Sequence, residues 1–324
     1  MSMLTRNSWV KIALVALLCL VVCGGLVSCN RGCTSAVNHA TSLGSSLYTD
    51  YELPNVGGGT VAAQDVQDLE IDWAAGSVAV EVVPDAEADG MVVIEEPASG
   101  QVPDQERVRW GMVGQKLVVA SGYERRGLCL WGCSLNVAQT QLTLRLPEST
   151  ARALGTMALN AASGRYTLGP IGCEQLRIYL ASGHVEGEGL QASDLQMQVA
   201  SGKVDLSGTF ADQMTLDQAS GNVAIACEGR CPSRSKIDLA SGNVQLQLPE
   251  DAGFSVDIDR TSGSFDYAFS DSAKQSGSAY VHGDGTGRIS VNMLSGSMTL
   301  APLPSVAAAG DAGSATLQES RIAK

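Results

Sequence analysis

The chain has 324 residues, which is long enough for one large domain or two modest ones. It carries a formal net charge of −13 at pH 7, 36 glycines and only 5% aromatic residues. Such acidity argues against nucleic acid and anionic lipid surfaces as partners, because both repel a negative protein. Cationic peptides and metal ions stay open as partners.

The first 29 residues have the parts of an export signal: basic Arg6 and Lys11, and then an apolar run over residues 12–27. The run ends in Leu-Val-Ser-Cys at Cys29, which resembles the bacterial lipobox, where the cysteine is acylated and becomes the new N-terminus. Two alternatives stay open. One is an uncleaved signal anchor, since the run is slightly shorter than a usual membrane span, and the other is ordinary cleavage. With a lipid or an anchor, the chain is tethered to the membrane and its body lies outside the cytoplasm.

Residues 30–60 are rich in Ser, Thr and Gly and have no sustained apolar period, so they are predicted to form a tether. The main domain is predicted over residues 61–302, and alternating apolar residues around Gly76 predict a first coil at its start. Residues 84–150 depart from this spacing and predict an irregular or antiparallel insert. The Ala/Gly/Ser-rich residues 303–324 predict a disordered tail.

A Ser-Gly pair recurs through the second half of the chain, and each glycine is followed two positions later by an apolar residue. The glycines are spaced by 19, 19, 19, 21, 21 and 33 residues, which is the fixed-period similarity of a stacked repeat. We expect the serines to stabilise turns rather than to act as nucleophiles. The pairs are Ser163 with Gly164, Ser182 with Gly183, Ser201 with Gly202, Ser220 with Gly221, Ser241 with Gly242, Ser262 with Gly263, and Ser295 with Gly296.

Apolar residues alternate with polar ones on both sides of each glycine, as at Leu195 and Leu206 on either side of Gly202. This predicts two short strands joined by a sharp turn, where glycine adopts a positive φ without a Cβ penalty. One such coil cannot bury its apolar face, so the coils must stack in parallel. The predicted fold class is therefore all-β, a right-handed parallel β-helix or β-solenoid. An antiparallel sandwich with evenly spaced turns is the alternative.

Two local cysteine pairs are candidates for small loop-closing disulfides in an exported protein. They are Cys129 with Cys133 and Cys227 with Cys231. The second pair lies where the repeat lengthens from 19 to 21 residues, which suits a pinned bulge. Free thiols are one alternative, and a zinc site is another, although structural zinc usually uses tighter C-x2-C spacing. Cys173 has no obvious mate.

Asp217, Asp238 and Asp259 each precede a repeat glycine by four residues, and Asn292 does so in the last repeat. A regular stack would align them in one outward column, and a cation such as calcium would relieve the repulsion between the carboxylates. The alternative is a solvated acidic face, helped by nearby basic residues such as Lys236. The three histidines lie away from any nucleophile motif, so neither a catalytic residue nor a cofactor is predicted.

The order of these elements resembles a known bacterial family. An export segment is followed by a Leu-x-Ile-x-Trp-x-x-Gly-x-Val unit ending at Val78, by a strand ending in Leu-Arg-Leu-Pro at Pro147, and by serial Ala-Ser-Gly-x-Val units. Over residues 61–301 this pattern resembles the adhesin-like family of β-strand-repeat domains, often described only as domains of unknown function. The resemblance implies a right-handed parallel β-helix on the bacterial surface, with roles in adhesion or in sensing and protecting the envelope under antimicrobial stress.

These observations predict a non-enzymatic, membrane-tethered binding module outside the cytoplasm, adhesin-like or associated with envelope stress. Extended faces built from repeats commonly serve as interaction platforms. The expected partners are the membrane, through the lipid or anchor, and an envelope component, a cationic peptide or a host surface. Nucleic acid is not expected. A carbohydrate-active enzyme on a parallel β-helix is one alternative function, and a purely structural envelope spacer is another.

Overall fold

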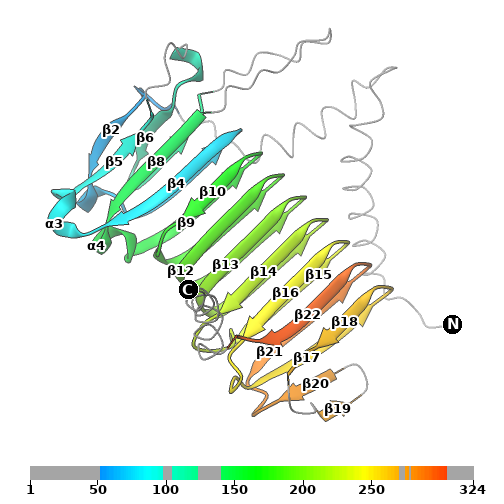
Figure 1. Cartoon of the computed structure of the whole chain (residues 1–324). Helices are drawn as coiled ribbons and strands as arrows, with labels where there is room; N and C mark the ends of the chain where they lie inside the picture. The colour runs from blue at the N-terminus through cyan, green and yellow to red at the C-terminus, as the bar shows by residue number, and fades with distance from the viewer. Residues whose placement is uncertain (1–51, 98–103, 123–139, 270–273, 277–278, 305–324) are drawn as a thin grey trace, which may run out of the picture.

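The computed structural model describes residues 52–97, 104–122, 140–269, 274–276 and 279–304. They form an all-β molecule in which strands stack side by side along one long axis (Figure 1). The all-β class predicted from the sequence is confirmed. The export segment with Cys29, most of the predicted tether, the pair Cys129 and Cys133, and residues 305–324 of the predicted tail lie outside the described residues.

Each rung of the stack consists of one strand before a glycine corner and one strand after it. We call the strands before the corners the leading face and the strands after them the trailing face. In spatial order, the leading face consists of β7 (Lys116–Ala120), β3 (Asp68–Trp73), β9 (Leu154–Ala161), β11 (Gly172–Leu180), the second parts of β12 (His184–Val199) and β13 (Lys203–Gln218), β15 (Arg234–Leu239), β21 (Gly287–Met293) and β17 (Phe254–Arg260). The trailing face consists of β8 (Thr140–Pro147), β4 (Gly76–Val83), β10 (Arg165–Leu168), the first parts of β12 and β13, β14 (Asn222–Cys227), β16 (Asn243–Leu248), β22 (Ser297–Pro302) and β18 (Ser264–Tyr267).

Neighbouring rungs pair in parallel, with equivalent repeat residues opposite one another. Leu176 lies opposite Leu195, which in turn lies opposite Met214, and on the trailing face Val185 lies opposite Val204. Because side chains alternate between the two sides of a strand, every second residue points inward. These five side chains are at most 1% exposed, so one narrow apolar core runs along the stack. The parallel pairing contradicts the antiparallel-sandwich alternative.

The rungs do not stack in chain order at either end, although simple sequential coiling predicts that they would. At the N-terminal end, β7 pairs with β3 and β3 pairs with β9, so the rung formed by β7 and β8 lies outside the first coil. At the other end, β21 lies between β15 and β17, and β22 lies between β16 and β18. The repeat predicts which residues form a rung, but it does not predict the order, because rungs with the same register can exchange places.

Residues 84–150 are therefore only partly an insert. Gly122 follows β7 as the other corner glycines follow their strands, but the trailing strand of this rung begins only at Thr140. The remaining strands pair antiparallel, as predicted for part of this segment, and they cover the open edges of the first rung. They are β5 (Met91–Glu95) on β8, β6 (Arg109–Val113) on β7, β2 (Gly59–Ala62) on β5 and β1 (Asn55–Val56) on β6.

The C-terminal end has a cap of its own. Strand β20 (Ala279–His282) pairs antiparallel with β17 and with β19 (Lys274–Ser276). Phe254, Tyr267, Phe269 and His282 pack together here, with ring centroids 4.7 to 6.5 Å apart. The short helices are α3 (Asp85–Ala88), α4 (Glu148–Ala151) and the 3-10 turns η1 (Ala63–Asp65) and η2 (Asp104–Glu106). Within the described ranges, no helix has the length and apolar character needed to cross a membrane.

Candidate interaction surface

The glycine corners form one continuous ladder along the edge where the two faces meet. Gly183 has a φ of +107°, and a Cβ there would lie 2.3 Å from the carbonyl oxygen of Gly164 in the neighbouring rung. Only glycine satisfies both constraints. The seven corner serines are all exposed, and Ser262 Oγ donates to the carbonyl of Leu294 at 2.8 Å, which fits a role in turns. The ladder runs through Gly76, Gly164, Gly183, Gly202, Gly221, Gly242, Gly296 and Gly263.

The leading face carries the predicted acidic column, with one change of order. Asp217 lies opposite Asp238, and Asp238 lies opposite Asn292. Asp259 comes last, on the far side of Asn292. The amide of Asn292 donates to Asp238 Oδ1 at 2.6 Å, and Lys236 donates to Oδ2, which raises the pKa of Lys236. Protein groups thus satisfy Asp238, and the cation at this column stays a prediction.

Opposite charges cluster on the trailing face over three rungs. His184 lies between two carboxylates, with Nε2 2.7 Å from Asp205 Oδ2 and Nδ1 3.2 Å from Glu186 Oε1. Lys203 lies 2.6 Å from Asp205, and Arg165 lies 3.7 Å from Glu186. Burial alone would raise the pKa of Asp205, but hydrogen bonds from Lys203 and His184 outweigh it, and the pKa falls below its usual value. Alternating charge therefore links neighbouring rungs.

Three of these side chains have the chemistry of metal ligands. Among the described residues, His184, Glu186 and Asp205 are the group whose ligand atoms lie within 4.8 Å of one another, and imidazole and carboxylate are both zinc ligands. However, Lys203 already binds Asp205, and Arg165 faces Glu186. A metal ion would have to displace both cations, so the arrangement acts as an ion-pair network rather than a metal centre.

A groove of about 910 Å³ lies at the turns opposite the glycine corners. It crosses five neighbouring leading-face strands, β3, β9, β11, β12 and β13, so at about 4.8 Å per strand it is on the order of 19 Å long. Leu154, Cys173 and Ala192 lie opposite one another along it, and charged Arg152 and Glu174 lie beside them. None of the described residues that line it is aromatic. The groove therefore offers hydrogen bonds and charge rather than ring stacking.

Two acidic side chains of the leading face are buried near the N-terminal end. Glu70 accepts a hydrogen bond from Lys116, and Asp72 accepts one from the amide of Asn160, both at 2.6 Å. Burial raises the pKa of Asp72 to about 7, although the hydrogen bond from Asn160 lowers it. Sequence reasoning missed Asp72. The signal was present, because Asp72 precedes Gly76 by four residues, as the predicted acidic column does for its own glycines.

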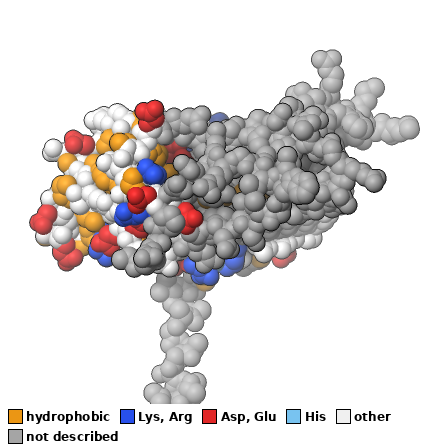
Figure 2. Space-filling model, turned by 90° about the horizontal axis from the view of Figure 1, so that it is seen from above, with side chains coloured by type: hydrophobic (Ala, Val, Ile, Leu, Met, Phe, Trp, Pro, Cys, Tyr) orange, Lys and Arg blue, Asp and Glu red, His pale blue; other side chains and the backbone are white. Residues whose placement is uncertain are grey.

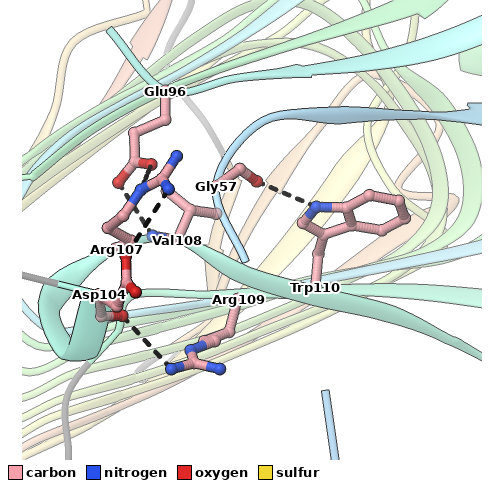
Figure 3. Close-up of polar contacts among 7 residues, drawn as sticks. All are labelled: Gly57, Glu96, Asp104, Arg107, Val108, Arg109 and Trp110. Atoms are coloured by element: carbon pink, nitrogen blue, oxygen red, sulfur yellow. Dashed lines mark hydrogen bonds and ion pairs between the residues drawn. The ribbon is translucent and has the colours of Figure 1, made fainter. Parts of the chain in front are cut away.

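A polar clamp around Glu96 closes the N-terminal cap (Figure 3). The carboxylate of Glu96 accepts hydrogen bonds from Arg107 Nε and from the backbone N–H of Val108, both at 3.0 Å. Trp110 Nε1 donates to the carbonyl of Gly57 at 3.0 Å, which joins β6 to the turn between β1 and β2. Sequence reasoning missed this clamp, because its partners belong to no repeat.

Around this cap, acidic, basic and apolar side chains are interspersed. Figure 2 shows them at the end of the stack that carries β2, β5 and α3. Val113 on β6 is 37% exposed. The visible part of this end is therefore a mixed surface, in contrast to the ordered columns of the leading and trailing faces.

Cys227 and Cys231 are buried at the turn between β14 and β15, and both are free thiols in this structure. Burial raises the pKa of both, that of Cys231 to about 12. Cys173 in the groove is also free, and burial raises its pKa to about 12. The disulfide between Cys227 and Cys231 stays a prediction.

Comparison with known families identifies the stack. The family described as Toastrack DUF4097 matches residues 66–301, which is more than half of the chain. The chain belongs to this family. The matched Toastrack region begins just before β3 and ends in β22, so it contains every rung and strands β5 and β6 of the N-terminal cap. The resemblance to an adhesin-like β-strand-repeat family of unknown function is confirmed.

Solved structures similar to this Toastrack chain include two bacterial proteins. One is named a putative cell adhesion protein from Clostridium sporogenes, with 12% identity, a TM-score of 0.37, and coverage of 77% of this chain and 100% of that one. The other is named a putative adhesin from Bacteroides fragilis, with 11% identity, a TM-score of 0.35, and coverage of 77% and 98%. No curated protein matches the sequence. At these scores the likeness carries no functional argument.

Proposed function

We propose that this Toastrack chain is a non-enzymatic, adhesin-like binding module that uses its outward faces to engage a partner outside the cytoplasm. The observation that carries the proposal is the register of the stack, which aligns polar side chains into straight columns over successive rungs. Such columns repeat the same group at about 4.8 Å, the spacing between paired strands. A partner that is itself extended can contact many rungs at once.

The rigidity of the stack supports binding rather than turnover. Every rung is held to its neighbours by a parallel hydrogen-bonded ladder, and the corners fit so closely that glycine is required. A surface that is ordered before binding loses little conformational entropy when a partner docks. The polar side chains on both faces bind one another in ion pairs and amide ladders, such as the one from Asn243 to Asn222.

Charge favours a cationic partner. The chain has a net charge of −13, and the acidic column of Asp217, Asp238 and Asp259 lies along the leading face. Of these three, Asp238 accepts hydrogen bonds from Lys236 and Asn292. A basic peptide laid across the rungs would meet several carboxylates in turn, so we expect the affinity to fall as the salt concentration rises.

The same proposal includes the location and the sense of winding. A lipid on Cys29, or a signal anchor over residues 12–27, would tether the stack to the membrane in the cell envelope, where it would serve in adhesion or in envelope stress. Intact-mass analysis of the membrane-extracted protein tests the lipid. The rungs are proposed to wind in the right-handed sense, as most parallel connections do. An experimental structure with left-handed rungs would contradict that part.

The partner is tested by titrating the detergent-solubilised full chain with a fluorescent lysine-rich peptide. We expect saturable binding that weakens about tenfold when three carboxylates of the leading face are neutralised, because each exposed pair contributes about 0.5 kcal/mol. The test variant is Asp217→Asn with Asp238→Asn and Asp259→Asn, and the control, with the same change in net charge, is Asp65→Asn with Glu87→Gln and Asp89→Asn at exposed positions near the N-terminal cap.

Other results of these binding experiments would contradict the proposal or favour one of the alternative functions. Equal weakening by the test and control variants would mean that only net charge matters and that the column is not a binding surface. No saturable binding to the peptide, to isolated envelope polymers or to host surface proteins would favour the structural-spacer hypothesis. Release of soluble fragments from an acidic polysaccharide would favour the enzyme hypothesis.

A further inference from the structure

The turn between β14 and β15, residues 228–233, is a fixed part of the stack although it breaks the repeat. It lies where the spacing of the corner glycines increases from 19 to 21 residues. Its two ends are held to the preceding rung, because Glu228 N–H donates to Gly208 at 2.6 Å and Ser233 N–H donates to Ala211 at 3.2 Å. The extra residues therefore form a closed turn on the edge of the stack.

Two cysteines stand at this turn. Cys227 is the last residue of β14, opposite Gly208, and is 0% exposed, while Cys231 is 8% exposed. Between them the chain folds back sharply, since Arg230 N–H donates to the carbonyl of Glu228 at 3.1 Å and Gly229 has a φ of +83°. Burial raises the pKa of Cys227, and the charge of Cys231 raises it further. Both ends of a short reversal thus carry a sulfur.

This turn also contacts the start of β21, which belongs to the rung that stacks out of chain order. Gly287 begins β21, and a Cβ at Gly287 would lie 2.6 Å from Cys231 Sγ, so that sulfur packs directly against the start of β21. The backbone N–H of Arg288 donates to the carbonyl of Ser233 at 3.2 Å. Strands β17 and β18 in turn pair with the stack through β21 and β22. A constraint on this turn therefore also constrains the start of β21, in addition to the ladder that pairs β21 with β15.

We propose that Cys227 and Cys231 form a disulfide that closes this turn and holds the start of β21 in place against it. The oxidant is a small-molecule disulfide. The thiolate of one cysteine attacks a sulfur of the oxidant and releases one thiolate, and the second cysteine then attacks the mixed disulfide and releases the other. Two cysteine thiols are oxidised, one S–S bond forms, one S–S bond breaks, and the two released thiolates take up the two protons.

Burial determines when this reaction can occur. Because burial raises the pKa of Cys231 to about 12, its thiolate fraction at pH 8 is on the order of 10³-fold lower than that of an exposed cysteine with a pKa of about 8.5. The two thiols of the folded, reduced protein therefore oxidise slowly. The disulfide forms during folding, while the turn is still open. Once formed, the bond is enclosed by the same packing and resists reduction.

The test uses the purified full chain, refolded from denaturant with a mixture of reduced and oxidised glutathione, then quenched with N-ethylmaleimide and mapped by peptide mass spectrometry. We expect a peptide pair joined by Cys227 and Cys231 that is alkylated only after reduction. Adding the same glutathione mixture to protein that has already folded in the reduced state should give the bond at least a hundredfold more slowly. Alkylation of both cysteines after oxidative refolding, or pairing of either with another cysteine, would overturn the proposal.

Hydrogen exchange of residues 287–302 measures the effect on the rung. We expect these amides to exchange at least tenfold more slowly in the oxidised protein than in the reduced one, and we expect the difference to vanish in Cys227→Ser. Cys173→Ser serves as the matched control, because it removes a half-buried thiol elsewhere and should keep the difference. If oxidation does not change the exchange of these amides, the disulfide does not hold the start of β21 in place. None of these readouts involves a binding partner, so they stand apart from the proposed function.

Discussion

Replacing Gly221 by alanine tests whether close packing at the corners holds the rungs in register. Gly221 has a φ of +96°, and a Cβ there would lie 2.2 Å from the carbonyl oxygen of Gly202, whereas ordinary contact begins at 3.4 Å. Neighbouring rungs would have to separate by about 1 Å. That movement breaks the hydrogen bond from Asn222 N–H to the carbonyl of Gly202, which is 2.9 Å long.

The expected loss follows from these contacts. The backbone hydrogen bond contributes about 1 to 1.5 kcal/mol, and alanine at positive φ costs about 1 to 2 kcal/mol, so Gly221→Ala should lower the free energy of unfolding by about 2 to 3.5 kcal/mol. The matched control is Gly114→Ala, because Gly114 has a φ of +65° but no atom within 4 Å of the added Cβ. It should cost only about 1 to 2 kcal/mol.

The measurement is urea unfolding of the full chain followed by far-UV circular dichroism, with the slope recorded as well as the midpoint. A repeat stack can unfold in parts, and a changed slope would reveal that. If Gly221→Ala loses no more stability than Gly114→Ala, the ladder reflects turn preference alone. The argument from rung spacing would then be refuted.

Three further predictions concern single side chains. Because the pKa of Asp72 is raised from 3.8 to about 7 in the folded state, stability should fall by up to about 4 kcal/mol as the pH rises from about 4 to about 7, and Asp72→Asn should remove this dependence in urea midpoints measured from pH 4 to 8. Leu216→Ala, at a 0% exposed core position, should cost about 2 to 5 kcal/mol in the same assay, whereas Thr215→Ala, which points outward, should stay within about 0.5 kcal/mol of the wild type. Tyr267→Phe removes the hydroxyl that lies 2.9 Å from His282 Nδ1, so it should cost about 1 kcal/mol in thermal unfolding, and an unchanged midpoint would contradict this contact.

The repeat made the inward residues and the corners predictable. Period-2 alternation around each Ser-Gly pair identified Leu195, Met197, Val204 and Leu206 as core positions, and all four are at most 4% exposed. These assignments needed only the local geometry of strands and the requirement that each coil be covered by another. The acidic column followed from the same register, and its members do lie opposite one another.

Contacts that do not follow from the repeat could not be predicted from the sequence. The clamp of Glu96 with Arg107 and the stacking of Phe254 with His282 each join residues that the repeat does not relate. The groove was equally hidden, since its lining comes mainly from five strands, and these residues converge only after the strands have stacked. In each case the partners are chosen by tertiary packing, for which a single sequence holds no direct signal.

The exchanged order of the rungs has a physical rationale in the edges of the sheet. An end rung presents unpaired backbone groups, and a strand with a hairpin beside it in the sequence can cover them. Strand β17 is followed by β19 and β20, and β20 pairs with it, while β7 and β8 are preceded by β6 and β5, which pair with them. In contrast, β21 and β22 are the last described strands, with no later described strand to cover them. The strands β21 and β22 therefore lie inside the stack, and the end positions are taken by rungs that have further strands beside them in the sequence. In this order, β7, β8 and β17 each have an antiparallel partner.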